Sequence, residues 1–312
     1  MKKILYVICI LPLMLFAKNS KVGGQAIIEG VMMRGKHKIS WAVRNPGGEL
    51  VVERYPFVSL CKTYKILATP VMRGAISLFE SLQLGYKALM RSAEIAMPEE
   101  QKPKEKNAKN SLSLIVSMLF AIAVMLGLFM YLPMFVAQLF LKNSAVGFNF
   151  IAGGIRIALF LMYLVGISFW KDIRRVFEYH GAEHKAIFAF EDDKELTLEN
   201  MRPYTTLHPR CGTSFLLLVA LVCILLFSII DMLVIHYLGP YPNVIARFLL
   251  HVLLIPLVSG ISYEVLRWSD RNQRIFPVSL LIKPGLWLQL ITTKEPDDMQ
   301  LETASAALKA AL

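Results

Sequence analysis

The chain has 312 residues, of which 55% are hydrophobic and 18% are charged, and its mean hydropathy is +0.51. Because an average soluble domain carries about 25% charged residues, this composition excludes a disordered chain and argues against a soluble globular protein. A net charge of +11 in so apolar a chain indicates a membrane protein with basic flanks. The sequence lacks the common nucleic-acid-binding motifs, and its four scattered cysteines exclude a disulfide scaffold: Cys9, Cys61, Cys211 and Cys223.

Residues 1–19 combine a basic start with a short apolar run, which is typical of a signal peptide or a membrane anchor. The run is shorter than the roughly 20 residues that a spanning helix needs. Leu15 also stands where a cleavage site after Ala17 would prefer a small residue. We therefore expect an uncleaved, membrane-associated segment.

Residues 20–110 are predicted to form a cytoplasmic region with a small antiparallel sheet and a helix. Alternating, partly β-branched sequence over residues 25–57 predicts two or three strands, with a turn at residues 45–48 (Asn-Pro-Gly-Gly). Residues 71–97 have helical apolar spacing and predict an amphipathic helix that lies against the membrane or the sheet. A charged linker follows, up to residue 110.

Four long apolar blocks predict four transmembrane helices in two hairpins, which makes the fold class mainly α and integral to the membrane. The hairpins cover residues 111–170 and 212–266, and we expect the first helix to tilt or to kink at Pro133. Ionisable residues inside spans are candidates for function, although pairing of Asp231 with Arg247 or Arg156 is the simpler interpretation. The full set is Arg156, Asp231, His236, Arg247 and His251.

Lysine and arginine gather outside these hairpins, whose short links contain only Lys142. The positive-inside rule therefore places the N-terminal region, the central segment (residues 171–211) and the tail (residues 267–312) in the cytoplasm. In the central segment we expect a helix over residues 173–189 and a second helix capped by Thr197. In the tail we expect a turn at residues 283–285 and a last helix from Pro296.

The central segment contains the pattern that points to chemistry. His180 and His184 are one helical turn apart and share a face, with Glu183 beside them, so the run has the form H-x-x-E-H. In that motif the two histidines bind zinc and the glutamate handles a proton. His208 and Cys211 add a second pair, so three histidines and one cysteine could form a tetrahedral set for Zn²⁺ or another divalent metal.

Other interpretations of the same residues stay open. Four protein ligands would make a closed structural site, whereas a free Cys211 could be a nucleophile or a redox thiol beside the metal. The histidines could instead cap helices or bind lipid phosphates together with Lys185 and Arg210. Glu29 and Glu264 lie in apolar contexts and could be metal or proton partners, although surface salt bridges are the simpler interpretation.

Several long motifs resemble the YqhQ-like family of bacterial integral membrane proteins: residues 23–35 (GGQAIIEGVMMRG), 179–187 (YHGAEHKAI), 208–215 (HPRCGTSF), 261–267 (ISYEVLR) and 284–304. The resemblance covers residues 21–312 in the family's order, and residues 1–19 depart from it. It implies a membrane protein with the His/Glu/Cys cluster as its hallmark and a metal-dependent enzymatic activity.

Together these features predict a zinc-dependent enzyme of the inner (cytoplasmic) membrane, hydrolytic, with a lipid-linked or membrane-embedded substrate. His180, His184, His208 and Cys211 would hold the metal, and Glu183 would be the general base. The alternatives are a non-catalytic scaffold or assembly factor with a structural metal site, and a transporter of small polar solutes that uses Arg156 and Asp231. The expected partners are the lipid bilayer, a substrate or protein within it and a second copy of the chain, but no nucleic acid.

Overall fold

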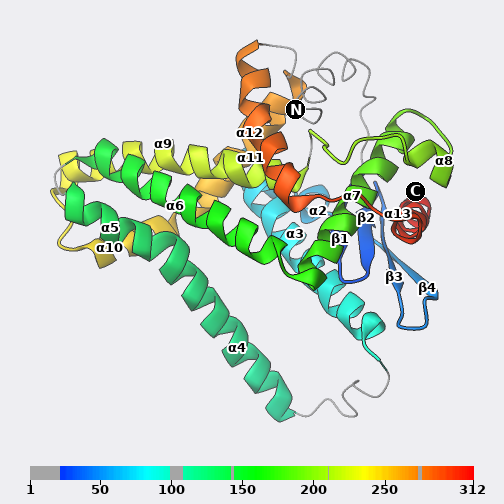
Figure 1. The fold of residues 1–312 in the computed structure, drawn as a ribbon. Helices are drawn as coiled ribbons and strands as arrows, with labels where there is room; N and C mark the ends of the chain where they lie inside the picture. Colours follow the sequence, from blue (N-terminus) through cyan, green and yellow to red (C-terminus); the bar gives the residue numbers. More distant parts are fainter. Residues whose placement is uncertain (1–21, 99–107, 142–143, 210, 273–275) are drawn as a thin grey trace.

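The computed structural model describes residues 22–98, 108–141, 144–209, 211–272 and 276–312, so the predictions for residues 1–19 lie outside the described residues. The protein is mostly helical, with one small antiparallel sheet (Figure 1). In the described part, three helices are long and apolar enough to cross a membrane: Val116–Phe140, Ala145–Ser168 and Val219–Leu238. A bent pair of helices, Val244–Leu253 and Ile255–Ser269, would be a fourth candidate span if the pair is counted as one. These helices support the prediction of a membrane protein.

The sheet has four strands in sequence order, each antiparallel to the next: β1 (Gly23–Ile27), β2 (Gly30–Arg34), β3 (Lys38–Arg44) and β4 (Leu50–Pro56). The prediction of two or three strands was too low, because the chain reverses within the first alternating run. Glu29 allows that reversal by taking a left-handed conformation with φ of 50°. The predicted turn before β4 is confirmed, with Gly48 at φ of 83°.

Helices cover both faces of this sheet. One face packs against α3 (Met72–Ala96), and the other packs against α7 (Lys171–Glu191) and α13 (Asp298–Ala311). Side chains therefore alternate between two buried cores along each strand: Val31, Met33 and Ala42 face α7 and α13, whereas Ile27, Met32, Ile39, Trp41 and Val43 face α3. The predicted helix over residues 71–97 is confirmed, and it lies against the sheet.

The apolar helices extend away from the sheet as a bundle in which α6 (Ala145–Ser168) and α9 (Gly212–Leu238) lie side by side (Figure 1). The first apolar block is α4 (Ala108–Leu126), a π-helical turn η4 (Gly127–Tyr131) and α5 (Leu132–Phe140). The π turn ends two residues before Pro133, which lacks the N–H that a regular helix needs. Arg156 of α6 donates to the carbonyl oxygen of Phe129 in that turn, at 2.9 Å.

The last apolar block, predicted as the fourth transmembrane helix, is a bent pair of helices. It forms α10 (Val244–Leu253) and α11 (Ile255–Arg271), bent by 53° at Leu254, because Pro256 begins the next helix and cannot continue the first. The turn predicted at residues 283–285 is wrong, because Pro284 lies inside α12 (Phe276–Thr292). This helix packs against α9 and α6, so part of the predicted tail belongs to the bundle.

The short helices are α2 (Leu60–Thr63), η2 (Lys65–Ala68) and α8 (Leu198–Met201). Thr197 caps α8 as predicted, and α7 covers the helix predicted over residues 173–189. The last helix begins later than Pro296, because Asp297 is its N-cap and forms a capping box with Gln300.

Asp231 is fully buried inside the bundle, where four side chains donate hydrogen bonds to it. The donors are Asn149 Nδ2 at 2.6 Å, Tyr241 Oη at 2.7 Å, Arg247 Nε at 2.8 Å and His251 Nε2 at 2.9 Å. The predicted ion pair of Asp231 is therefore made with Arg247. It connects α9 to α10 and, through Asn149, to α6.

Candidate metal centre

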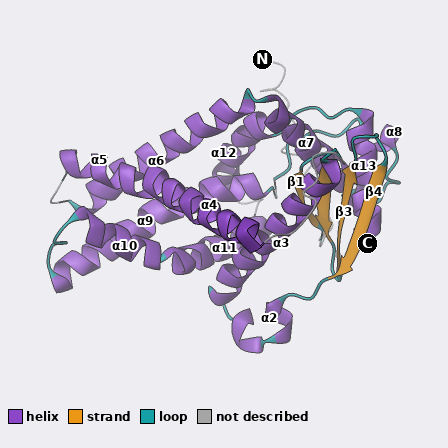
Figure 2. Ribbon diagram, turned by 90° about the horizontal axis from the view of Figure 1, so that it is seen from below, coloured by secondary structure: helices purple, strands orange, loops and turns teal. Residues whose placement is uncertain are grey.

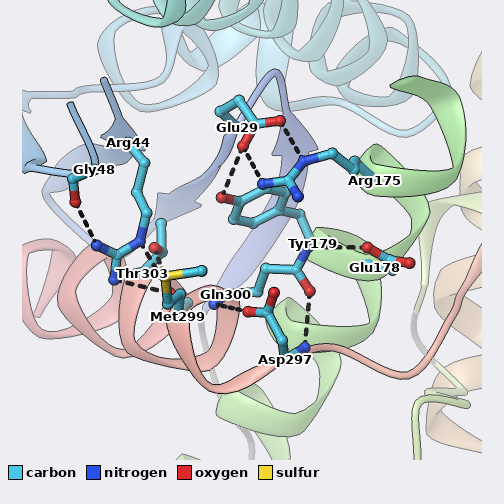
Figure 3. A network of polar contacts seen from close by, with 10 residues as sticks. All are labelled: Glu29, Arg44, Gly48, Arg175, Glu178, Tyr179, Asp297, Met299, Gln300 and Thr303. Carbon is cyan, nitrogen blue, oxygen red and sulfur yellow. Dashed lines mark hydrogen bonds and ion pairs between the residues drawn. The ribbon is translucent and has the colours of Figure 1, made fainter. Parts of the chain in front are cut away.

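Polar contacts fix α7, the helix with the H-x-x-E-H run, against the sheet and α13 (Figure 3). Glu29, in the turn between β1 and β2, accepts hydrogen bonds from Arg175 at 2.5 Å and from the Tyr179 hydroxyl at 3.4 Å. On the other side, Gln300 of α13 donates to Glu178 at 3.1 Å. Glu29 is thus in the salt bridge expected from its position. Together these contacts fix the position of α7 relative to the sheet and α13.

His180, His184 and Cys211 come together at the base of the bundle. Their candidate ligand atoms all lie within 4.8 Å of one another, and His180 Nε2 is 3.1 Å from Cys211 Sγ. The two histidines share one face of α7, as predicted from their spacing, and Cys211 directly precedes α9. His184 is 1% exposed, Cys211 is 8% exposed and His180 is half-buried, so most of the group is enclosed.

Backbone carbonyl groups orient both histidine rings. Nδ1 of His180 is 2.8 Å from the Thr292 carbonyl oxygen, and Nδ1 of His184 is 2.5 Å from that of Thr206. Because a carbonyl oxygen only accepts hydrogen bonds, we assign the proton of each ring to Nδ1, which leaves the Nε2 lone pair directed at the centre. Metal-binding histidines are oriented in the same way by a carbonyl or a carboxylate.

Burial also favours the metal-binding form of His184. Desolvation and the neighbouring His180 lower the pKa of His184 to about 4, so the ring is neutral at pH 7. Its Nε2 atom is buried and makes no hydrogen bond of normal geometry among the described residues, although the nearby Cys211 sulfur raises its proton affinity. Neutral imidazole is the form that binds a metal ion.

Glu183 lies beside this group but is not one of the three ligand residues. It is 5% exposed, and its Oε2 atom has no hydrogen-bond partner among the described residues. Burial raises the pKa of Glu183 to about 8, whereas His180 lowers it. Gly24 of β1 packs directly on the carboxyl group, because a Cβ atom there would lie 2.6 Å from Oε1. Sequence reasoning missed this role of Gly24, and the Gly-Gly pair at residues 23–24 was its one signal.

His208, the fourth predicted ligand, lies next to the group and outside it. Its Nε2 atom is 3.6 Å from Glu191 Oε2, with both side chains buried, and its ring centroid is 5.5 Å from that of His184. Lys185 is buried and forms an ion pair with Glu295. Its charge is therefore already paired, which argues against its predicted role as a ligand of lipid phosphates. Arg210, the other proposed phosphate ligand, lies outside the described residues.

Gln289 of α12 holds the chain at His208, and we predict a large loss of stability from Gln289→Leu. The fully buried Gln289 side chain accepts from the His208 N–H at 2.7 Å and donates to its carbonyl oxygen at 2.8 Å. Losing both bonds from buried backbone groups should cost about 2–4 kcal/mol. Chemical unfolding in detergent micelles measures this cost, with Gln83→Leu on an exposed helical surface as the control. Equal stability of the two variants would contradict the prediction.

The centre is built where α7, the start of α9 and the end of α12 meet. The sheet is at the end of the molecule opposite α5 and α10, so the centre lies at the junction between the bundle and the sheet (Figure 2). These features define a class: helical proteins with helices of membrane-spanning length and a buried His/His/Cys group that could hold a metal ion.

Comparison with known proteins identifies the family. Residues 69–312 match the family described as protein of unknown function DUF1385. The chain is also 36% identical over 294 residues to the uncharacterized protein YqhQ of Bacillus subtilis (strain 168). This alignment covers 90% of this chain and 89% of that protein. The chain therefore belongs to this YqhQ-like family, in agreement with its motifs. No solved structure matches it.

Proposed function

We propose that this protein is a zinc-dependent membrane enzyme that hydrolyses a lipid-linked or membrane-embedded substrate at the cytoplasmic face of the inner membrane. The observation that carries the proposal is the buried group of His180, His184 and Cys211 with the carboxyl group of Glu183 beside it. Catalytic zinc sites typically use three protein ligands and keep a fourth position open, whereas structural sites use four. A three-ligand group therefore favours an enzyme over a scaffold.

The donor atoms fit zinc. Two imidazole nitrogens and a thiolate suit Zn²⁺, while carboxylate-rich sets suit Mg²⁺ or Ca²⁺. The hydrogen bonds from Nδ1 to the Thr206 and Thr292 carbonyl groups hold both Nε2 atoms toward the same point. When bound, Zn²⁺ would act as a Lewis acid and lower the pKa of a water molecule toward 7.

The remaining chemistry falls to Glu183. Its buried Oε2 atom is not engaged by a described side chain. Burial alone favours the protonated form of Glu183, and the positive charge of a bound Zn²⁺ would shift it toward the carboxylate. In that form it could accept a proton from the attacking water and return it to the leaving group. Gly24 packs on this carboxyl group, and the surrounding sheet and helices keep it away from bulk solvent. We assign Glu183 the role of general acid and base.

Topology suggests the substrate class and the side of the membrane. Lysine and arginine gather outside the apolar helices, which orients the sheet region toward the cytoplasm under the positive-inside rule. Cys211 directly precedes α9, and α6 leads into α7, so the proposed centre lies at the end of two apolar helices. A substrate that resides in the membrane can reach this position without leaving the lipid phase.

Metal content tests the proposal. We expect purified wild-type protein to bind about one zinc ion per chain, and we expect Cys211→Ser and His184→Ala to bind far less, because each removes one of three ligands. Cys61→Ser and His37→Ala, outside the site, are the matched controls and should bind as the wild type does. In Co²⁺-loaded protein, a thiolate-to-metal charge-transfer band should be present and should disappear in Cys211→Ser.

Glu183→Gln separates the two uses of a metal. We expect this variant to keep its zinc and its fold and to lose the cellular function of the protein, because the amide cannot accept a proton. Full function in Glu183→Gln, together with unfolding of His184→Ala, would assign the metal a structural role. A wild-type protein without stoichiometric metal would exclude both uses.

A further inference from the structure

Helix α3 has apolar residues on two opposite sides, and the sheet covers only one of them. Its inner side, which includes Leu84, Ala88 and Ile95, packs against β3 and the neighbouring strands. The opposite side carries six large apolar side chains that are 43% to 65% exposed. We call them the outer stripe of α3: Met72, Phe79, Leu82, Tyr86, Leu89 and Met90.

The spacing of the outer stripe is helical. Steps of three, four and seven residues keep Met72, Phe79, Leu82, Tyr86 and Met90 on one side of the helix. The segment before α3 adds further exposed apolar side chains: Val58, Leu60, Tyr64 and Ile66. An apolar surface this long, which no described residue covers, marks an interaction site.

The polar border of the outer stripe is basic. The acidic side chains of α3 are already in ion pairs, Glu80 with Arg34 at 3.5 Å and Glu94 with Arg91 at 2.9 Å. Exposed lysines remain along α3 and the segment that precedes it: Lys62, Lys65 and Lys87. An apolar stripe flanked by lysine is the pattern of a helix that lies in the interface of an anionic membrane.

The start of α3 packs against α11 of the bundle. A Cβ atom at Gly74 would lie 2.7 Å from Tyr263 Cβ and 2.8 Å from the Gly260 carbonyl oxygen of α11, so α3 and α11 are in close backbone contact. An ion pair between Arg73 and Glu264 fixes the same junction, as expected for Glu264. The exposed side of α3 therefore starts beside a helix of the bundle.

We propose that α3 lies on the bilayer, with its outer stripe in the lipid and its lysines on anionic headgroups. A second copy of the chain is a poorer occupant of this surface. A symmetric dimer through the stripe would place two identical lysine borders against each other, and like charges repel. Lipid headgroups of negative charge complement the same border.

This position brings α3 close to the candidate metal centre. A Cβ atom at Gly85 of α3 would lie 2.7 Å from the Gln25 side chain of β1, while the adjacent Gly24 packs on Glu183. One strand therefore separates the lipid-bound helix from the buried carboxyl group. The proposal about α3 does not depend on a bound metal, so it can fail or succeed independently of the enzymatic one.

Photo-crosslinking in lipid nanodiscs tests this proposal on the full chain. Benzoylphenylalanine is placed at Phe79 or Leu82 of the outer stripe, and at Tyr55 of β4 as an exposed aromatic control. The nanodiscs contain equal parts phosphatidylcholine and phosphatidylglycerol, and mass spectrometry identifies the adducts. We expect phospholipid adducts at Phe79 and Leu82, none at Tyr55, and an excess of phosphatidylglycerol.

A triple variant with Lys62→Gln, Lys65→Gln and Lys87→Gln tests the role of charge. Each lysine lost should lower the preference for phosphatidylglycerol by up to about fivefold. Crosslinks at Phe79 to a second copy or to another part of the same chain would overturn the proposal, as would the absence of adducts. An unchanged lipid preference in the triple variant would overturn the assignment of the lysines to headgroups.

Discussion

Asp231→Asn is expected to destabilise the protein by about 3–5 kcal/mol, because it leaves the buried Arg247 cation without its counter-ion. The Asp231 carboxylate is fully buried and accepts hydrogen bonds from four side chains, two of them on α10. Asparagine keeps the size of the side chain but offers one acceptor oxygen and no charge. Unfolding from detergent micelles by denaturant measures the loss.

Two further variants make this prediction specific. Asp172→Asn removes an exposed carboxylate at the start of α7 and should change stability by less than about 0.5 kcal/mol. Arg247→Met in the Asp231→Asn background should recover part of the stability, because the unpaired cation is then removed. If Asp231→Asn is as stable as the wild type, the buried ion pair does not hold α10 on the bundle.

Gly181→Ala is expected to disturb the stability of the protein and, under the proposed function, its affinity for zinc. A Cβ atom at Gly181 would lie 2.0 Å from the Lys294 carbonyl oxygen and 3.1 Å from Thr206 Cγ2. The Lys294 backbone cannot move freely, because its N–H donates to the Phe177 carbonyl oxygen of α7 at 2.9 Å. Overpacking of this kind costs about 1–3 kcal/mol.

The effect on metal affinity follows from the residues that would have to move. Thr206 and Thr292 orient the two histidines through their carbonyl groups, and both lie on the segments pushed away by the new methyl group. Loss of such orienting contacts typically lowers metal affinity by about 10- to 100-fold. Gly154→Ala in α6 is the control, since nothing lies within 4 Å of its Cβ position. Zinc titration measures the affinity of both variants. Equal zinc affinities of Gly181→Ala and Gly154→Ala would contradict the prediction.

Local patterns predicted the parts of this protein that depend on short stretches of chain. Helical spacing placed His180 and His184 on one face of α7, and the short separation of His208 and Cys211 put both residues near that face. The sequence could not show which of the two residues joins the candidate metal site, because that depends on where their side chains point. Cys211 joins the histidine pair, whereas His208 pairs with Glu191.

Residues that support the candidate centre carried almost no sequence signal. Thr206 and Thr292 act through backbone carbonyl groups, which every residue has, so their side chains could not reveal the role. Gln289 contacts the His208 backbone from 81 residues away in the chain. Contacts of this kind depend on the packing of α12 against the bundle. The sequence did not predict α12, because its pattern at residues 283–285, inside this helix, indicated a turn.

Hydropathy and residue spacing are local properties of the chain, and they were enough to predict membrane-spanning helices, the amphipathic helix α3 and the histidine pair. Long-range packing determined the rest: the 53° bend before α11, the contact of Gly24 with Glu183, and the ion pair of Asp231 with Arg247. It also determined which apolar side of α3 the sheet covers and which side stays exposed. A periodic pattern shows that a face will be covered, but only the surrounding elements of the fold determine what covers it.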